Sequence, residues 1–452
     1  MNTAELDSTL AGEALAPGSS DWDSARAAWN LAVDQHPAAV VFATSAEDVA
    51  AAVRFAAANG LRVAAQATGH AAGMHATLED TVLVKTARMA AVDVDPEARV
   101  ARIAAGALSA DAAKAAAAHG LAPLLGSSPD VGVIGFTVGG GVGWLARPYG
   151  LACNSVRAAQ VVTGAGEIVR ADADNEPELF WALRGGGGAF GVVTELEVDL
   201  FEVDQVFAGD VMYDAEHAPT VLRAYRDWAR QAPRELTSSV RFLTPPPLPV
   251  VPEPVRGRPL MTVTAAYAGD PAEGEALLAP MRDLAPVVID AYAAQSAEGL
   301  CRIHGDPEQP VPGLTRGAMI RELDDGAIDA LIGVGGAGSP LLQIDLRHLG
   351  GAVGESAADA GALAYLSGEF AVAAVGVPMG PLTPEAIAPA LEGMAQALEP
   401  WSTGLSYLNF SEQPGDGSAA FSDEDYARLQ AVKGATDPDS IIRGGQDIPP
   451  AR

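Results

Sequence analysis

The sequence predicts an α+β fold in two parts, and three observations indicate it. Strand and helix patterns alternate over roughly the first 200 residues. Beyond that point, amphipathic helices alternate with strand-like runs, a pattern typical of an antiparallel sheet flanked by helices. The chain has 452 residues, more than one hydrophobic core usually organises, and 49% of them are hydrophobic. We therefore expect two substructures, each with a large buried core.

The first part begins with a strand, a helix and a strand. Residues 39–43 form a short apolar run, and Ser45 is expected to cap the helix that follows. Asp48 stands three residues later, as in a capping box, and Gly60 ends the helix. Residues 61–66 are the next strand, so this β-α-β unit needs parallel strands or a mixed sheet. The later elements are a strand at 81–85, a hairpin of 92–94 and 100–103, an alanine-rich helix at 109–120, and strands at 158–163, 167–170 and 192–198.

The second part is expected to be a helix-flanked antiparallel sheet. Helical patterns cover residues 218–232 and 272–284, and strand-like runs cover residues 238–243, 260–267, 341–346 and 371–377. The proline-rich stretch 245–259 reads as a long hairpin loop inside this unit, not as a domain linker.

Composition excludes several classes of function. The formal net charge is −30, and a surface this acidic repels nucleic acid and anionic lipid. The two cysteines, Cys153 and Cys301, can build neither a disulfide framework nor a cysteine zinc site. No apolar run reaches the ~18 residues of a membrane span, and the first 30 residues lack a secretory pattern, so we expect a cytoplasmic protein.

Two glycine-rich segments are candidates for a ligand site. The hexapeptide 186–191 fits G-x-G-x-x-G, but a strand follows it where a dinucleotide site needs a helix, so a nicotinamide site is not expected. No phosphate-binding P-loop motif occurs. The segment 126–144 is richer, and so many glycines allow the backbone to approach a large flat or charged ligand. Its glycines are Gly132, Gly135, Gly139, Gly140, Gly141 and Gly143.

A third segment, Gln66-Ala67-Thr68-Gly69-His70, directly follows a predicted strand. Small residues with successive free N–H groups at a strand end suit a diphosphate. From spacing alone, His70 is equally well read as a hydrogen-bonding loop residue or as a cofactor contact. Ser-His-Asp hydrolysis has no G-x-S-x-G motif to support it.

Together these segments resemble a known family. Four motifs carry the resemblance: A-T-G-H at 67–70, V-G-V-I-G-F-T-V-G-G-G-V-G-W at 131–144, R-P-Y-G-L-A-C-N-S-V at 147–156 and P-E-L-F-W-A-L-R-G-G-G-G-A-F-G-V-V-T-E-L at 177–196. They look like the motifs of the berberine bridge enzyme-like FAD-linked oxidases. That group belongs to the vanillyl-alcohol oxidase superfamily. The Y-L-N-F at 407–410 and the D-P…I-P-P ending match it as well, so the resemblance covers nearly the whole chain.

The resemblance implies a cofactor, an architecture and a reaction. FAD would be bound by a two-part FAD-binding domain, residues 1–200 and 400–452, with a substrate domain at 201–399. The histidine of the family's G-H motif bonds to the 8α-methyl of the flavin, and here it is His70. Ser128 stands where some members carry a cysteine for a second bond, so one covalent link is expected. The partners would be a small organic substrate and molecular oxygen; oligomeric state stays open.

The resemblance also implies the site residues. The tyrosine of the family's Y-x-N motif, Tyr407 here, would be the catalytic base, with simple packing on the flavin as the alternative. A tyrosine pKa near ~10 would have to be lowered for that role. Asn409 would contact the flavin or orient Tyr407. The expected cofactor contacts are His70, Gln66, Ala67, Thr68, Gly69, Ala71, Gly73, Ser128, Gly132, Val133, Gly135, Thr137, Gly139, Gly140, Gly141, Gly143, Asn154, Val193, Tyr407 and Asn409.

Several features leave the function open. Asn154, Ala189 and the Gly444-Gly445 pair depart from the family pattern, and each costs a potential hydrogen bond to FAD. A monooxygenase-like tailoring oxidase, a dehydrogenase with poor oxygen reactivity and an inert flavin carrier are the alternatives to an oxidase. Other residues with reactive side chains are expected in ordinary surface or core positions, with a minor chance of lining the site: His75, Tyr213, Tyr267, His304, Arg347 and His348.

Overall fold

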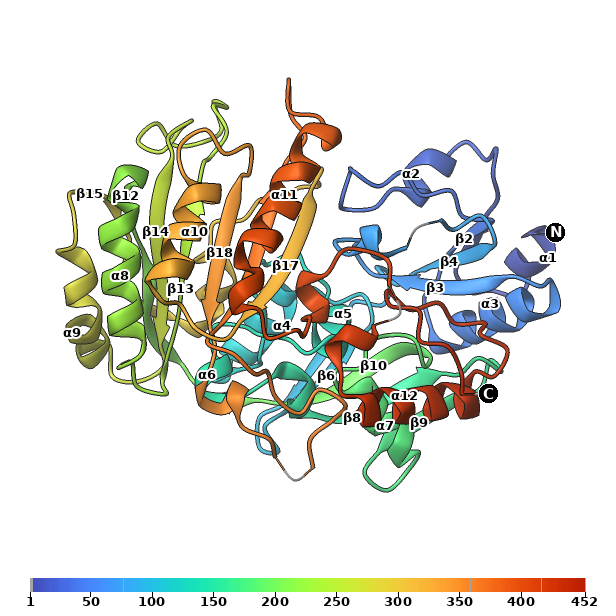
Figure 1. Ribbon diagram of the computed structural model, residues 1–452. Helices are drawn as coiled ribbons and strands as arrows, with labels where there is room; N and C mark the ends of the chain where they lie inside the picture. The colour runs from blue at the N-terminus through green and yellow to red at the C-terminus, as the bar shows by residue number, and fades with distance from the viewer. Residues whose placement is uncertain (1–2, 76, 358, 416, 452) are drawn as a thin grey trace.

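The computed structural model describes residues 3–75, 77–357, 359–415 and 417–451. The described residues form a four-stranded and a five-stranded sheet in the first part of the chain and an eight-stranded sheet in the second part (Figure 1). Strands β7 (Leu121–Ala122) and β11 (Phe201–Glu202) pair in a small two-stranded sheet. The α+β architecture is therefore confirmed, with its elements in the expected order. Within the described residues, no helix is long and apolar enough to cross a membrane, and no group of His, Cys, Asp and Glu could hold a metal ion.

The first sheet has four strands and positions the loop that ends in His70. Its order is β1 (Glu13–Leu15), β2 (Ala39–Phe42), β4 (Thr81–Lys85) and β3 (Arg62–Gln66). The pairs β2–β4 and β3–β4 are parallel, while β1–β2 is antiparallel, so the sheet is mixed. Helix α3 (Ala46–Ala58) connects β2 to β3, and its N-cap is Ser45, which accepts the Asp48 N–H. The capping box is only half formed, because the Asp48 carboxylate binds Thr44 and residues 11–12 instead.

The second sheet has five antiparallel strands and carries the glycine-rich segments at its ends. Its order is β5 (Val92–Asp95), β6 (Val100–Ala104), β10 (Val192–Asp199), β8 (Val156–Val162) and β9 (Ile168–Asp172). Helices α4 (Ser109–Ala117) and α7 (Pro177–Leu183) pack with it in one apolar core. Because α7 precedes the glycines at 185–188 and β10 follows them, that cluster lacks dinucleotide-site geometry, as expected.

The third sheet is antiparallel throughout, and four helices cover one of its faces (Figure 1). The helices are α8 (Ala218–Ala229), α9 (Pro271–Arg282), α10 (Asp325–Gly335) and α11 (Pro384–Leu398). The strands are β15 (Val287–Asp290), β12 (Gln205–Asp214), β14 (Leu260–Tyr267), β13 (Leu236–Leu243), β18 (Gln343–His348), β19 (Phe370–Gly376) and β17 (Leu314–Ile320), with β16 (Ala293–Ser296) beside β12. Tyr213 and Tyr267 point into the core under the helices.

The proline-rich loop joins β13 to β14 as a hairpin, as expected from the sequence. Four strands of this sheet, β12, β15, β16 and β17, were not expected. Gly209 interrupts β12, and Gly317 interrupts β17, so neither strand shows the β-branched run that marks a strand in a sequence. Strand β18 begins two residues later than expected, at Gln343.

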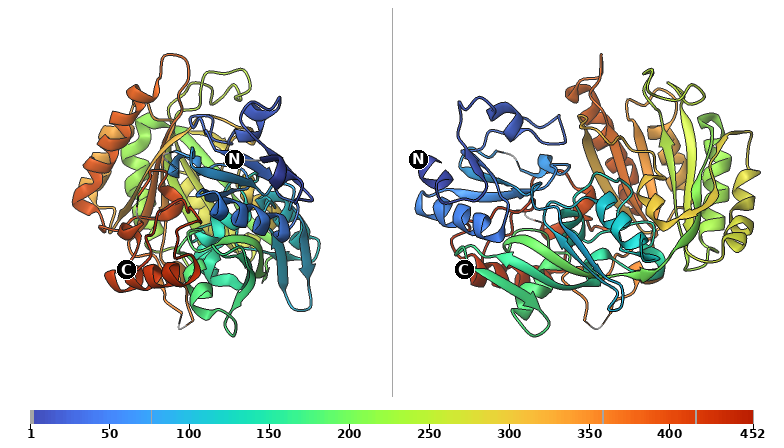
Figure 2. Two further views of the ribbon diagram at one scale, coloured as in Figure 1. Left: turned by 90° about the vertical axis from the view of Figure 1, so that its right-hand side faces the viewer. Right: turned by 180° about the vertical axis from the view of Figure 1, so that it is seen from behind.

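The last 30 residues return to the first part of the molecule. Helix α12 (Asp423–Thr436) packs beside α7, far from the large sheet (Figure 2). A buried ion pair fixes it there: Nζ of Lys433 donates to Asp437 at 2.6 Å and to the carbonyl oxygens of Ala189 and Ile442. Both charged side chains are 1% exposed. This pair therefore ties the C-terminal segment to the glycine loop that ends at β10.

We expect Lys433→Met to lower the free energy of unfolding by about 3–5 kcal/mol, because it leaves the Asp437 carboxylate buried without a cation. Urea unfolding of the full chain measures this change. Lys114→Met is the matched control, since Lys114 is exposed on α4 and should change stability by less than about 0.5 kcal/mol. Equal free energies of unfolding for the two variants would show that the ion pair does not hold the C-terminal segment in place.

Candidate active site

The loop after β3 presents free backbone donors. The N–H groups of Thr68, Gly69, His70 and Ala71 donate to no acceptor among the described residues. The loop itself is held in place, because its carbonyl oxygens at Thr68 and Gly69 accept from the N–H groups of Trp29 and Asn30. Consecutive free N–H groups in a fixed loop form a concavity for an anion. The loop therefore suits a diphosphate, as its sequence indicates.

His70 lies in a half-buried pocket of aromatic and acidic character. Its ring stacks on Trp29 with centroids 3.9 Å apart, and Nδ1 lies 2.8 Å from the Thr68 hydroxyl. Nε2 is buried and has no hydrogen-bond partner among the described residues. Burial lowers the pKa of His70 to about 4, although the nearby charge of Asp130 acts in the opposite direction. The imidazole is therefore neutral at pH 7, and a ring nitrogen has a lone pair available.

The glycine-rich segment contains the short helix α5 (Val133–Val138), and most of its glycines are crowded by protein. A Cβ at Gly139 would collide with Asn409, and a Cβ at Gly143 would collide with the Leu125 carbonyl. Cβ atoms at Gly132, Gly140 and Gly141 would also meet protein atoms at less than 3.0 Å. Close packing within the chain thus accounts for a glycine at five of the six positions, and their role as cofactor contacts stays a prediction.

Gly135 is the exception. Nothing lies within 4 Å of a Cβ at Gly135, and the residue is exposed. Gly188, in the second cluster, also faces open space. These two glycines are where the backbone leaves room for a large group.

Tyr407 is buried against the glycine segment. Its hydroxyl oxygen accepts the backbone N–H of Val142 at 2.8 Å. Burial raises the pKa of Tyr407, and the Val142 N–H and the charge of Arg347 offset this only in part. The direction is opposite to the one a catalytic base needs. Asn409 donates from its amide to the carbonyl oxygen of Phe136 at 2.9 Å, so it holds the end of α5 and does not contact the Tyr407 hydroxyl.

Several other expected contacts are occupied inside the protein. The amide of Gln66 bonds to Gln35 and Lys85. The amide of Asn154 bonds to backbone atoms of residues 361–364 through both its donors and its oxygen, which leaves no donor for a cofactor. Val193 lies in β10 with its side chain in the apolar core, where Val133 also packs. For these positions, only backbone contacts to a ligand remain open.

The remaining expected contacts lie around the loop and α5. Ala67 is half-buried beside Gly132, Ala71 is exposed, and Gly73 packs against the backbone of Glu412. Thr137 is buried within α5. The hydroxyl of Ser128 donates at 2.8 Å to Asp306, which lies in a loop of the second part of the chain.

The face of the large sheet that points away from the helices carries two neighbouring rows of polar side chains, which we call the polar rows. Strand pairing fixes both rows, since directly paired residues on one face lie side by side. One row runs across β12, β14, β13 and β18 as Asp210, Thr264, Ser239 and Arg347. The other runs across β14, β13 and β18 as Thr262, Arg241 and Asp345.

A buried charge cluster occupies the end of the polar rows. Arg347 donates to Asp345 at 3.1 Å, and His304 bonds to Asp306 at 3.0 Å. Nε2 of His304 lies 3.7 Å from Asp345. Burial alone would raise the pKa of Asp345. The charges of Arg347 and Arg241 and the contact with His304 have the larger, opposite effect, so the pKa is lowered overall and the carboxylate is ionised. Burial and Arg241 tend to lower the pKa of His304, yet the two aspartates raise it overall.

The polar rows meet the glycine segment at Val142. Its carbonyl oxygen accepts from Arg347 at 3.4 Å, while its N–H bonds to Tyr407. The Arg347 guanidinium also lies 5.0 Å from the ring centroid of Trp144. The charge cluster and Tyr407 therefore belong to one site, formed where the sheet faces the glycine segment.

This site contains buried polar atoms without partners. Buried polar groups in native proteins are nearly always hydrogen-bonded, so a cluster of unbonded ones indicates a missing ligand or water. Among the described residues the unbonded atoms here are Oγ of Ser239, Oγ1 of Thr262 and Thr264, Nε of Arg241 and Arg347, Nε1 of Trp144 and Oδ1 of Asp345. They include donors, hydroxyls and one carboxylate oxygen, a set suited to a polar small molecule.

Sequence reasoning missed most of this site. His304 and Arg347 were expected in ordinary positions, and Arg241, Asp345 and Asp306 were not considered. His348, in contrast, points to the other face of the sheet, beside Phe370. The signal was present as polar residues two apart in otherwise apolar strands, such as Asp345 and Arg347 in β18, which alternation places on one face.

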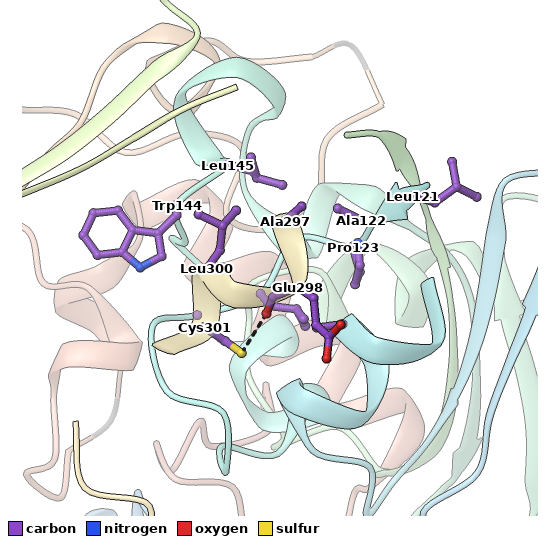
Figure 3. Close-up of a pocket in the computed structure, with 12 residues that line it drawn as sticks. Leu121, Ala122, Pro123, Trp144, Leu145, Ala297, Glu298, Leu300 and Cys301 are labelled. Atoms are coloured by element: carbon purple, nitrogen blue, oxygen red, sulfur yellow. Dashed lines mark hydrogen bonds between the residues drawn. The ribbon is translucent and has the colours of Figure 1, made fainter. Parts of the chain in front are cut away.

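A separate small cavity lies where α4 meets the short helix η4 (Ala297–Arg302) (Figure 3). Its volume is about 20 Å³, room for roughly one water molecule, and most of its lining side chains are apolar. The thiol of Cys301 is turned toward the carbonyl oxygen of Glu298. This cavity is too small for a substrate.

Glu412 is half-buried beside the segment that follows His70, close to Asn30 and Gly73. Burial raises its pKa to about 7. Between the ordinary glutamate pKa of about 4.3 and the raised value near 7, the folded state holds the Glu412 proton more tightly than the unfolded state does. The free energy of unfolding therefore falls as the pH rises through this range. We expect Glu412→Gln to add up to about 3 kcal/mol to the free energy of unfolding at pH 8.5 and almost nothing at pH 4.5.

Thermal and urea unfolding at both pH values check this prediction. Glu253→Gln is the control, because Glu253 is exposed in the proline-rich loop and should show no pH-dependent difference. A gain that is equal at both pH values would contradict the raised pKa of Glu412.

Comparisons with known proteins agree with the geometry. Residues 37–172 match the family model described as an FAD binding domain. Over 98% of this chain and 97% of the relative, the sequence is 29% identical to (R)-6-hydroxynicotine oxidase of Paenarthrobacter nicotinovorans. It is 34% identical to glucooligosaccharide oxidase of Sarocladium strictum over 48% of this chain and 45% of that one. The crystal structure of 6-hydroxy-D-nicotine oxidase from Arthrobacter nicotinovorans superposes with a TM-score of 0.82 at 27% identity, covering 97% of both chains.

The fold and the site define an FAD-linked oxidoreductase with a separate substrate-facing sheet. The chain belongs to the berberine bridge enzyme-like FAD-linked oxidoreductases. The residues present fit the cofactor: the loop at 68–71 has free donors for the diphosphate, Gly135 and Gly188 leave open space, and Nε2 of His70 is buried without a partner.

Proposed function

We propose that this enzyme is an oxidase that removes a hydride from a small alcohol, amine or phenol-like substrate and passes the electrons to molecular oxygen, giving hydrogen peroxide. The observation that carries the proposal is the set of unbonded polar atoms on the polar rows, joined through Val142 to the glycine segment and Tyr407. FAD, when bound, supplies the acceptor for two electrons. We further propose that it is held by one covalent bond, from His70, since Ser128 offers no thiol.

Within this proposal, the polar rows bind and orient the substrate. Three donors of fixed direction, on Arg241, Arg347 and Trp144, can hold an oxygen or nitrogen of the substrate. The free hydroxyls of Ser239, Thr262 and Thr264 can both donate and accept. The site is buried, so these contacts form away from bulk water and orient the substrate more strongly than exposed ones.

A base must take the proton from the O–H or N–H group that is oxidised. Tyr407 is the base that the resemblance implies, but burial raises its pKa. Asp345 is ionised, so it can accept a proton without first losing one: one of its oxygens is fixed by Arg347, and the other lies 3.7 Å from Nε2 of His304 and makes no hydrogen bond. We propose that Asp345 accepts the proton and that Tyr407 holds the glycine segment through Val142.

The proposal is tested with a panel of amines, alcohols, phenols and sugars, including 6-hydroxynicotine and glucooligosaccharides, the compounds for which two relatives are named. Peroxide formation in air with one of these classes is the expected result. Stopped-flow reoxidation separates the alternatives: fast reaction of the reduced protein with oxygen identifies an oxidase, and slow reaction identifies a dehydrogenase. Failure of every substrate to bleach the flavin anaerobically would contradict an active enzyme.

A further inference from the structure

Two side chains next to His70 have no role in the redox reaction proposed above. The indole ring of Trp29 stacks on the imidazole at 3.9 Å with an interplanar angle of 20°. The indole N–H donates to Oδ2 of Asp130 at 2.6 Å. The second oxygen of the same carboxylate, Oδ1, lies 3.6 Å from Nε2 of His70. The three side chains therefore form a closed group in which each touches the other two.

This group does not have the geometry of a structural ion pair. Nε2 of His70 and Oδ1 of Asp130 are both buried, and neither has a hydrogen-bond partner among the described residues. Burial of the imidazole lowers the pKa of His70 to about 4, so the ring is neutral at pH 7 and no ion pair exists there. At 3.6 Å, Nε2 and Oδ1 are too far apart for a good hydrogen bond, so the pair is not optimised for a structural role. The arrangement is explained if the ring proton is transferred during a reaction.

We infer that Asp130 accepts the imidazole proton when His70 becomes attached to the flavin, and that Trp29 holds the ring and the carboxylate in position for that step. The inference rests on the covalent attachment proposed above. It assigns the two residues to installing the link, and not to turnover of substrate.

A C–N bond forms between the flavin's 8α-carbon and Nδ1 of His70, while a C–H bond of the methyl group and the N–H bond of the imidazole break. The carbon is oxidised by two electrons, and molecular oxygen is the oxidant that finally receives them with two protons, as hydrogen peroxide. The proton on Nε2 faces Asp130 and moves to its carboxylate, as a base accepts a proton from a reacting group. Thr68, now 2.8 Å from Nδ1, turns aside as the bond forms.

The local backbone keeps Trp29 in place for this role. The N–H of Trp29 donates to the carbonyl oxygen of Thr68 at 3.0 Å, so the indole is attached to the same loop as the imidazole. Gly69 has a φ of +93°, and a Cβ there would lie 2.9 Å from the Ala28 side chain. Only a glycine lets the loop approach residues 28–29 this closely.

The test measures the rate of attachment, independent of enzyme activity. The full chain is purified from riboflavin-limited cells and incubated in air with excess FAD. At intervals the protein is precipitated with acid, and the flavin that stays with the precipitate is measured. Asp130→Asn is expected to slow attachment at least roughly 10²-fold, the lower end of the range for loss of a general base. Trp29→Phe keeps a stacking ring but loses the N–H, so a smaller slowing is expected. Asp93→Asn, an exposed carboxylate on β5, is the control and should match the wild-type rate.

Each outcome has one meaning. Attachment at the wild-type rate in Asp130→Asn would overturn the inference, and so would loss of non-covalent FAD binding, measured by gel filtration before precipitation. If Asp130→Asn fails to fold, Trp29→Phe decides, because an unchanged rate in that variant overturns the inference too. If the wild-type protein binds FAD but never yields acid-stable flavin, the proposed covalent attachment fails instead.

Discussion

Replacing His70 by alanine is expected to release all flavin from acid-precipitated protein, whereas the wild-type precipitate stays yellow. The physical reason is that His70 offers a neutral imidazole, whose Nδ1 can bond to the flavin, next to a loop with free N–H donors. The variant should still bind FAD, since the loop donors are backbone groups that the substitution leaves in place. Absorbance of the precipitate and of the supernatant measures both quantities.

His75 provides a matched control for this experiment. It lies five residues away in the same segment, and burial lowers its pKa to about 4 as well. His75→Ala should keep the acid-stable colour. Acid-stable flavin in His70→Ala, or its loss in His75→Ala, would show that the link is made elsewhere.

Asp345→Asn is expected to reduce kcat/KM by roughly 10²- to 10⁴-fold with the best substrate of the panel, the range for loss of a general base. Tyr407→Phe is expected to cost less than about tenfold, because it removes one hydrogen bond, to the Val142 N–H, and no reacting group. The two variants differ by only a few atoms from the wild-type side chains. Anaerobic reduction of the flavin, followed by stopped-flow absorbance, reports the step directly.

The pH dependence distinguishes the two bases independently of the variants. The pKa of Asp345 is lowered, so this carboxylate is ionised throughout pH 5–8 and the reduction rate should be flat in that range. The pKa of Tyr407 is raised above its ordinary value near ~10, so with Tyr407 as base the rate would climb steadily up to and beyond that pH. A rate that rises tenfold per pH unit between pH 6 and 9 would overturn the assignment of Asp345.

Local patterns in the sequence were sufficient to predict much of the fold. The strand at 260–267 was predicted with its observed bounds, because eight residues of strand-forming character end at turn-forming neighbours. Helix α8 was recognised from its amphipathic repeat. The residues of α10 were missed, since Gly326, Gly333 and Gly335 weaken its helical pattern, and packing on α11 and α8 compensates for their low propensity.

The candidate site was predictable only where one short segment supplies its chemistry. The loop of His70 and the Y-x-N motif are local, and both were found. Arg241, His304 and Asp345 come from three distant segments, and only the register of β13 and β18 and the path of the chain at 304–306 bring them together. A single polar residue in a strand is indistinguishable in sequence from a solvent-facing one, so the cluster needed the tertiary structure.

The two faces of the large sheet also bear on how such enzymes diverge. One face is packed against four helices, and a change there disturbs the core. The residues of the other face occupy the alternate positions of the same strands, and selection can exchange them one at a time while the helices stay in place. A new substrate preference can then arise from a handful of codons in β13, β14 and β18, on an inherited scaffold that still folds and still holds its flavin.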